Sequence, residues 1–366
     1  MSSRWKATAS KPAFLVVLAV SFATLLVAAC SGTPAAAPPK GASGAAAVAA
    51  APTTAAAVPT QGPAQTVGPL PSVTPSRPYK MAFANWAESV SFSVEVRKGM
   101  QAAAKKYGVD LIVMDNKQDV NQANINVNDV LTQKADFFFE YQSSPQANVE
   151  IAQKLHKANM KAIAIQVPMP GYPFYVVDNE KGGFLGGQAG AEAAKKRWGS
   201  NINLNMLVIG VPEAGPAFAI RDQGAIKGAQ SVFPNVKTTE VSDKSDAATA
   251  RQEAADYLTA HPNDKILIWT HVDQTALSVL SAVKAAGREN DVVIASLGGE
   301  SVIFPELRNP NSIIVGTAAF FPERWGEDLI PLAIRWLNGG PPPPTNMNPP
   351  MEFLTGANVN KWYPNQ

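Results

Sequence analysis

The chain has 366 residues, of which 31 are lysine or arginine and 29 are aspartate or glutamate, so the formal net charge is +2. This near balance excludes the strongly basic surface that nucleic-acid-binding proteins need, and we expect no nucleic-acid partner. Cys30 is the only cysteine. An internal disulfide and a cysteine-rich metal site are therefore excluded as well.

Residues 1–29 have the features of a bacterial export signal. Three basic residues precede an apolar stretch at residues 13–29, and small residues lead into Cys30. This pattern resembles the lipobox of bacterial lipoproteins, whose cysteine becomes the new amino terminus and receives lipid chains that anchor it. We predict a signal peptide at residues 1–29 and lipidation of Cys30. An uncleaved transmembrane helix is the alternative, although about 17 apolar residues is the lower limit for a span.

Residues 30–78 form a segment rich in alanine and proline. Lys40 and Arg77 are its only charged residues, and it has few large apolar side chains. Such a composition buries too little apolar surface to offset the entropy lost on ordering. We therefore predict a disordered tether between the lipid anchor and a folded part. Because the leader holds three basic and no acidic residues, its removal changes the net charge from +2 to −1.

Residues 79–366 contain two series of apolar strand-length runs alternating with amphipathic helical segments. The first series has predicted strands at 80–84, 110–114, 136–139 and 161–165. The second has predicted strands at 205–209, 236–241, 265–269, 291–296 and 313–318, with helices at 220–233, 247–260 and 274–286. Short continuous apolar strands between amphipathic helices are typical of parallel sheets covered on both faces. We predict an α/β protein with two similar Rossmann-like lobes.

Two further segments bear on how the lobes connect. Residues 182–187 are glycine-rich but lack the strand-turn-helix pattern of a phosphate-binding loop, so we interpret them as a site of close helix packing. A last helix at 323–337, ended by Gly339-Gly340 and four prolines, is expected to return to the first lobe. In open parallel sheets ligands bind beyond the carboxyl ends of the strands, which predicts a site between the lobes.

The order of these elements resembles the type I periplasmic binding proteins of the ribose/galactose group. The resemblance rests on residues 80–83 leading to Phe92 and Gly99, on 158–163, on Asp178-Asn179, on 221–224, on 258–262, and on Asp273 with Ala276-Leu277. Residues 354–359 are also similar to the closing strand of that group. The resemblance implies a two-lobed fold with a three-segment hinge near Val177, Phe320 and Pro349.

The resemblance also implies domain boundaries and a function. One lobe would comprise residues 79–177 and 321–349, and the other 178–320 and 350–366. Proteins of this group capture a small solute, usually a sugar, by hinge closure and deliver it to an ABC-type permease. The expected partners are therefore a sugar or sugar-like solute, the permease and, through Cys30, the membrane. We expect a monomer with no cofactor and no metal, lipid-anchored on the outer side of the cytoplasmic membrane or facing the periplasm.

The site residues follow from matching positions and from the ends of predicted strands. We predict ligand contacts from Trp86, Val90, Phe92, Tyr141, Gln166, Arg221, Val272, Asp273, Leu297 and Phe320. Several of these depart from the pattern of the ribose-binding group, because Val90 and Val272 stand where it has asparagine and Leu297 stands where it has aspartate. A pocket with fewer hydrogen-bonding groups predicts a ligand with fewer hydroxyl groups than ribose. Arg221 is retained and is the candidate for a carboxylate or ring oxygen.

Several of these candidates could have a purely structural role instead of a ligand contact. Trp86 could lie at the rim, Arg221 could pair with Asp222 or Asp273, and Phe92 and Phe320 could only pack the hinge. Trp269 lies within an apolar strand and is expected in the core, whereas Glu140 could line the site with Tyr141 or cap a turn.

Nothing in the sequence predicts catalysis. None of the three histidines, His156, His261 and His271, has a catalytic or metal-binding pattern, and no Gly-x-Ser-x-Gly motif is present. We therefore expect no enzyme. The alternative function is a ligand-sensing receptor subunit that signals through a membrane sensor kinase or chemoreceptor, which the sequence does not distinguish from uptake.

Overall fold

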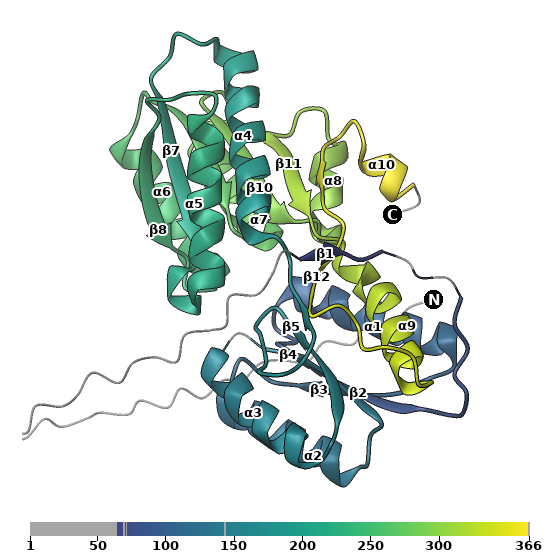
Figure 1. Ribbon diagram of the computed structural model, residues 1–366. Helices are drawn as coiled ribbons and strands as arrows, with labels where there is room; N and C mark the ends of the chain where they lie inside the picture. Colours follow the sequence, from purple (N-terminus) through teal and green to yellow (C-terminus); the bar gives the residue numbers. More distant parts are fainter. Residues whose placement is uncertain (1–63, 69, 71, 143, 365–366) are drawn as a thin grey trace, which may run out of the picture. The chain divides into compact units, whose positions relative to one another are not determined.

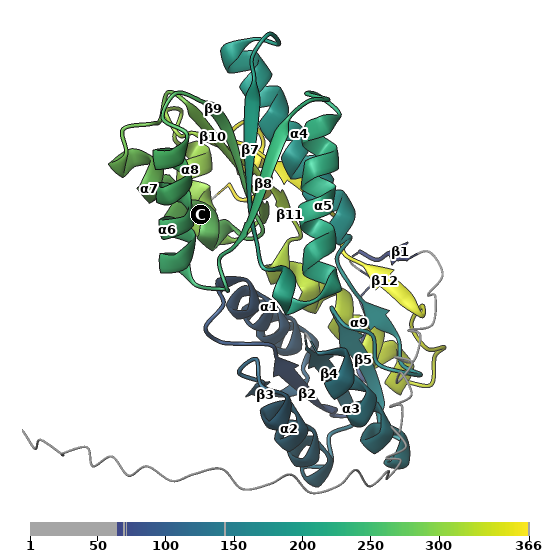
Figure 2. The ribbon, with the colours of Figure 1, turned by 90° about the vertical axis from the view of Figure 1, so that its left-hand side faces the viewer.

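The structure is a computed structural model that describes residues 64–68, 70, 72–142 and 144–364 (Figure 1). The predicted signal peptide, Cys30 and the tether up to residue 63 lie outside the described residues. In the described part the strands form a seven-stranded and a six-stranded sheet, with helices on both faces of each (Figures 1 and 2). This confirms the predicted α/β fold of two parallel-sheet lobes.

The first sheet has the strand order β1-β12-β6-β5-β4-β2-β3, and all its paired strands run parallel. Its strands are β1 (Gln65–Thr66), β2 (Lys80–Asn85), β3 (Asp110–Asp115), β4 (Phe137–Tyr141), β5 (Lys161–Ile165), β6 (Phe174–Tyr175) and β12 (Asn346–Asn348). The helices that pack on it are α1 (Ser91–Tyr107) and α9 (Trp325–Leu337) on one face, and α2 (Val120–Thr132) and α3 (Pro145–Lys157) on the other. We call this unit the first lobe.

The second sheet has the order β13-β11-β10-β9-β7-β8, in which only the pair β11 and β13 is antiparallel. Its strands are β7 (Leu204–Gly210), β8 (Lys237–Ser242), β9 (Lys265–Thr270), β10 (Val292–Gly298), β11 (Ile314–Ala319) and β13 (Glu352–Leu354). The main helices are α4 (Asn179–Trp198) and α5 (Pro216–Gln230) on one face, and α6 (Ala247–Ala260) and α7 (Asp273–Ala285) on the other. This unit is the second lobe.

Short helical segments complete the described part. They are η1 (Pro212–Ala214), η2 (Ser301–Ile303), α8 (Phe304–Arg308), η3 (Pro322–Arg324) and α10 (Val359–Trp362). The chain passes between the two sheets three times, where β6 leads into α4, where β11 leads into α9, and where β12 leads into β13. No helix among the described residues has the length and apolar character needed to cross a membrane.

Local sequence explains the regular ends of these elements. All five residues of β4 are buried, as expected for a strand covered on both faces. Asp119 caps α2 by accepting a hydrogen bond from the backbone N–H of Gln122 at 2.7 Å, and Asp246 does the same for Thr249 in α6. Gly108 ends α1 with φ 68°, a left-handed conformation that glycine adopts without steric cost.

The glycines at residues 182–187 lie inside α4 and bring it against α5. A Cβ atom added at Gly187 would stand 1.9 Å from the carbonyl oxygen of Ala225, and one at Gly183 would stand 2.0 Å from that of Arg221. The prediction of close helix packing is confirmed. Because Arg221 lies on α5, this contact also helps to set its position relative to the start of α4.

Two sequence expectations differ from the structure. Residues 354–359 were expected as a strand, but only Leu354 belongs to β13, and a turn and α10 follow. A hydrogen bond from the backbone N–H of Thr355 to the side chain of Asn358 at 2.7 Å stabilises this turn. Gln65 and Thr66 fall in the predicted disordered tether, yet they form β1 and pair with β12. Val67 extends this pairing through its N–H, which donates to the carbonyl of Asn348 at 2.9 Å.

Candidate ligand-binding site

Aromatic side chains from both lobes meet beyond the carboxyl ends of the strands. Trp86 follows β2, and its ring centroid lies 6.1 Å from those of Tyr141 on β4 and Phe218 on α5. Phe92 on α1 lies 6.5 Å from Phe320, which follows β11. The predicted residues Trp86, Phe92, Tyr141 and Phe320 are thus brought together, and all are at least nine-tenths buried.

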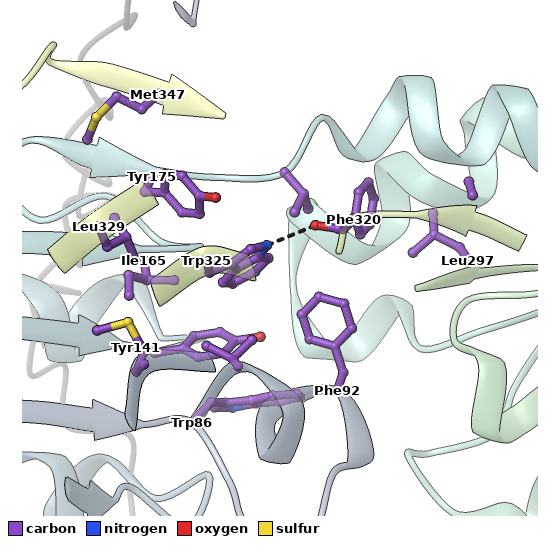
Figure 3. Close-up of a cluster of buried hydrophobic side chains, with 14 of the residues drawn as sticks. Trp86, Phe92, Tyr141, Ile165, Tyr175, Leu297, Phe320, Trp325, Leu329 and Met347 are labelled. Carbon is purple, nitrogen blue, oxygen red and sulfur yellow. Dashed lines mark hydrogen bonds between the residues drawn. The ribbon is translucent and has the colours of Figure 1, made fainter. Parts of the chain in front are cut away.

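Trp325 supports this cluster from the start of α9. Its indole N–H donates to the carbonyl oxygen of Phe320 at 2.9 Å, and its ring packs against Phe92, Tyr141 and Tyr175 (Figure 3). It is completely buried. The indole therefore holds the segment that leads out of β11 against the first lobe. Phe321, the next residue, takes a left-handed backbone conformation with φ 52°, which is unusual for an aromatic residue.

Arg221 is the only cation among the predicted site residues, and it is 8% exposed. Its Nε–H donates to Oδ1 of Asn179 at 2.6 Å, and Nη1 lies 3.4 Å from the carbonyl oxygen of His271. The guanidinium carbon lies 4.7 Å from the ring centroid of Phe218 and 5.9 Å from that of Phe320. Within the described residues no carboxylate lies at ion-pair distance from Arg221, so the alternative pairing with Asp222 or Asp273 is not formed.

The environment of Arg221 disfavours its charge. Burial lowers the pKa of Arg221 to about 10, and electrostatic interactions with Tyr141, Asp222 and Glu300 act in the opposite direction. The guanidinium remains protonated at neutral pH because this value is still well above 7. A buried cation held by one amide and by aromatic faces retains capacity for an oxygen ligand.

Asp273 opens α7 and is engaged within the second lobe. Its carboxylate accepts hydrogen bonds from the hydroxyl of Ser296 and from the backbone N–H groups of Gly299 and Glu300, the latter two at 2.7 and 2.8 Å. It is fully buried. Oδ2 therefore holds the turn after β10, while Oδ1 bonds Ser296 within β10. The structure places Asp273 in support of the site, and a direct ligand contact would have to displace these donors.

Glu300 lies on this turn and reaches the first lobe. The hydroxyl of Ser91, at the start of α1, donates to its Oε2, while its Oε1 is buried without a hydrogen-bond partner among the described residues. Burial raises the pKa of Glu300 to about 8, and the neighbouring Asp273 acts in the same direction. Glu300 therefore keeps its proton at neutral pH and can itself donate a hydrogen bond.

His271 follows β9 and belongs to a buried polar cluster of the second lobe. Its Nε2 lies 2.8 Å from Oδ2 of Asp243, which also accepts from the hydroxyl of Thr275 at 2.7 Å. Its Nδ1 is buried and has no hydrogen-bond partner among the described residues. Its ring centroid lies 6.4 Å from that of Phe218. His271 thus lies beside the aromatic and guanidinium groups of the site.

The remaining predicted residues occupy the margins of the site. Val90 and Val272 are the residues that precede α1 and α7, and both are half-buried. Gln166 follows β5 with a left-handed φ of 67°, and its backbone N–H donates to the carbonyl of Tyr175. Leu297 is buried on β10 and, with Phe320, lies against Gly182 of α4.

The structure also shows where Trp269 and Glu140, two further strand residues, lie. Trp269 is fully buried and lies against Gly186, so the expected core position is confirmed. Glu140 packs on the opposite face of β4 from Tyr141, where it accepts a hydrogen bond from Asn116 at 3.0 Å. Burial raises the pKa of Glu140 to about 8. The structure therefore places Glu140 against Asn116, on the face of β4 away from Tyr141.

Sequence reasoning missed Phe218, Asn179, Glu300 and the setting of His271. Asn179 begins α4 and Phe218 lies in the first turn of α5, each near the end of a strand or crossing segment, a position that favours ligand sites. Glu300 follows Gly298-Gly299, both with positive φ. Glycines of this kind indicate a tight turn, but the sequence alone does not indicate what the following side chain contacts.

No group of three or more histidine, cysteine, aspartate or glutamate residues suited to a metal ion occurs in the described ranges. The site is instead a set of aromatic faces with one guanidinium, one imidazole and one buried carboxyl group. Aromatic faces and a few convergent polar groups are typical of sites for small organic solutes.

The comparisons agree with this class of site. A model of the periplasmic binding protein domain family matches residues 81–341, and the chain belongs to this family. A search of curated protein sequences finds no significant match. The predicted resemblance to type I periplasmic binding proteins is confirmed.

Solved structures show the same fold. An ABC transporter solute-binding protein from Actinobacillus succinogenes with bound D-allose is 20% identical, with a TM-score of 0.69 over 78% of this chain and 100% of that one. A Mycobacterium smegmatis solute-binding protein with bound glycerol has the same identity and TM-score over 78% and 96% of the two chains. The Caulobacter myo-inositol binding protein is 19% identical, with a TM-score of 0.67 over 79% and 97%.

Proposed function

We propose that this protein is an extracytoplasmic solute-binding lipoprotein that captures a small sugar or a less hydroxylated sugar-like molecule between its lobes and delivers it to an ABC-type permease. Membership of the periplasmic binding protein family supports the binding role. The three chain crossings between the sheets support a hinge. The signal sequence ending at Cys30 supports export and attachment to the membrane.

The burial of Arg221 between aromatic rings carries this proposal. A guanidinium taken out of water without a carboxylate partner is costly, and proteins maintain such a cost where the group has a role. Its free donors suit a ring oxygen, a hydroxyl or a carboxylate of a solute. The aromatic faces of Trp86 and Phe320 suit the apolar faces of a ring.

The proposed contacts come from both lobes. Trp86, Phe92 and Tyr141 would contribute from the first lobe, and Arg221, Phe218 and Phe320 from the second. Val90, Gln166, Val272 and Leu297 would shape the margins, while Asp273 would hold the turn that carries Glu300. A ligand that touches both lobes stabilises the arrangement in which they are together, which is the physical basis of capture by closure.

Thermal-shift screening of the whole protein tests the binding role. Sugars, polyols, sugar acids and aromatic solutes would be added one at a time, and a solute that binds only the native state raises the unfolding midpoint. We expect at least one class to raise it, and the Arg221→Met variant to abolish that rise. Stabilisation that survives Arg221→Met would contradict the proposed site.

Anchoring and delivery need a test in cells. We expect Cys30→Ser to remove a labelled fatty acid and to release the protein from the membrane fraction. Uptake of the solute found in the screen should fall on deletion of the gene. Normal uptake together with loss of a transcriptional response to the solute would favour the sensing role.

A further inference from the structure

His271 carries an inference that rests on the proposed function. We infer that His271 is a specificity-determining residue of the interlobe site, whose Nδ1 accepts a hydrogen bond from a hydroxyl group of the bound solute. The ligand class that follows is a hydroxyl-bearing molecule such as a sugar or polyol.

The position of the imidazole hydrogen follows from its neighbours. Hydrogen bonds from His271 and Thr275 hold the pKa of Asp243 below its ordinary value although burial acts to raise it, so Asp243 is an ionised acceptor. The nitrogen that faces it, Nε2 at 2.8 Å, must carry the hydrogen. In the neutral imidazole Nδ1 then has a bare lone pair and can act only as an acceptor.

This lone pair has no use within the described protein. Nδ1 is buried and lacks a partner, and His271 is 4% exposed. A purely structural role for His271 would account for its bond to Asp243. It would leave the buried acceptor Nδ1 unexplained. Buried polar atoms of native proteins nearly always have a partner, so Nδ1 needs an explanation, and its place beside the site points to a group supplied by the bound solute.

The surroundings of His271 belong to the site. Its carbonyl oxygen lies 3.4 Å from Nη1 of Arg221, and its ring lies 6.4 Å from Phe218, which in turn contacts Trp86 of the first lobe. His271 also follows β9 directly, at the carboxyl end of the sheet. A solute held by Arg221 and the aromatic rings would therefore lie within reach of groups around His271.

Two substitutions separate the two ring nitrogens. His271→Gln places an amide near the Nε2 position and can keep the bond to Asp243, but it has no acceptor at Nδ1. His271→Asn places an amide near Nδ1 and loses the bond to Asp243. His261→Gln is the matched control, because His261 bonds Asp264 at 2.8 Å in a partly exposed position of the same lobe.

Calorimetry with D-allose, myo-inositol and glycerol measures the effect. For each probe that binds the wild type, we expect His271→Gln to weaken binding about tenfold with little change in the unfolding midpoint. His271→Asn should lower the midpoint more and the affinity less. Unchanged affinity in His271→Gln, or the reverse order of the two variants, overturns the inference. If none of the three probes binds the wild type, the same comparison is made with the solute that the thermal-shift screen identifies, and a screen without any stabilising solute overturns the proposed function.

A second measurement does not depend on any probe. Nitrogen NMR of histidine-labelled whole protein, assigned with His271→Gln, should show hydrogen on Nε2 and none on Nδ1. Hydrogen on Nδ1 overturns the inference. A crystal structure with a fixed water on Nδ1 both with and without the binding probe does so too, because the solute would then not supply the hydrogen bond.

Discussion

The hydroxyl of Ser91, at the start of α1, donates a hydrogen bond to the carboxyl group of Glu300, which lies 209 residues further along the chain. A second bond accompanies it, because Glu95 on the same helix accepts from the backbone N–H of Ser301 at 2.9 Å. Residues four apart share one face of a helix, so the two acceptor-donor pairs lie side by side. Together they form a latch between an element of the first lobe and the turn that follows β10.

Removal of one latch bond should favour separation of the lobes. We expect Ser91→Ala to weaken solute binding about fivefold, the size of one net hydrogen bond, while the unfolding midpoint changes little. Calorimetry gives the affinity, and small-angle scattering of the free protein should show a more expanded average. The control is Ser281→Ala at an exposed position on α7. Equal affinity in Ser91→Ala and the control would show that the latch does not contribute to closure.

The free energy of unfolding should fall as pH rises from the ordinary pKa of a glutamate to the raised pKa of Glu300. Burial raises the pKa of Glu300 to about 8, so the folded state keeps a proton that the unfolded state releases above about 4.5. The free energy of unfolding therefore falls between about pH 4.5 and pH 8 and levels off above it. We expect Glu300→Gln to make this fall shallower in denaturant titrations across pH.

Glu140 is the matched comparison for that titration. Its pKa is also raised to about 8 by burial, but it lies in the first lobe and bonds Asn116. Glu140→Gln should flatten the same part of the pH profile without affecting solute affinity, whereas Glu300→Gln should change both. A profile that is identical in the wild type and both variants would contradict the assigned protonation of these carboxyl groups.

Arg221→Met should separate binding from stability. The variant removes a buried cation that has no carboxylate partner at ion-pair distance among the described residues, so we expect the unfolding midpoint to stay within a few degrees of the wild type or to rise. Solute binding should fall at least about a hundredfold, since charged hydrogen bonds are worth more than neutral ones. Arg251→Met, at an exposed position on α6, is the control. A large loss of stability would instead assign Arg221 a structural role.

Gly187→Ala should damage the second lobe. The added Cβ would stand 1.9 Å from the carbonyl oxygen of Ala225, and backbone atoms cannot move aside as a flexible side chain can. We expect a loss of about 3 kcal/mol in the free energy of unfolding, at the upper end for overpacking. Lys195→Ala on the exposed face of the same helix should have little effect. A stable Gly187→Ala protein would mean that α4 and α5 can separate at low cost.

Val67→Pro should release β1 from the sheet. Proline lacks the N–H that Val67 donates to the carbonyl of Asn348 at 2.9 Å, whereas Val67→Ala keeps it. Faster hydrogen exchange in peptides covering residues 64–68 and 346–348 is expected for the proline variant alone. Equal exchange in both variants would indicate that the pairing of β1 with β12 contributes nothing to protection.

Much of the fold could be predicted because local burial patterns are strong in this chain. The strand at 161–165 and the helix at 247–260 have the predicted bounds. Helix α5 begins at Pro216, four residues before its predicted start, because Gly215 and Pro216 start it without the apolar spacing that indicated the rest. The strand expected at 354–359 was wrong, since Asn358 stabilises a turn within it.

The candidate site could be predicted only in part. Trp86, Phe92, Tyr141, Arg221 and Phe320 were predicted because they stand at strand ends or at positions shared with a known group, and the structure brings them together. Glu300 was missed because its importance depends on Ser91, a residue of the other lobe. For Glu140 the sequence left two alternatives, lining the site with Tyr141 or capping a turn, although successive residues of a strand point to opposite faces.

The sequence by itself determined the α/β class, the two series of strands, the close packing of α4 and the family resemblance. Each depends on residues near one another in the chain, whose spacing encodes which side chains are buried. Only the tertiary structure decided which polar groups meet. It placed Arg221 against Asn179 and Phe218, left Nδ1 of His271 without a partner in the described part of the chain, and joined Ser91 to Glu300. Such contacts depend on how separate elements pack, and the spacing of residues along the chain does not determine this packing.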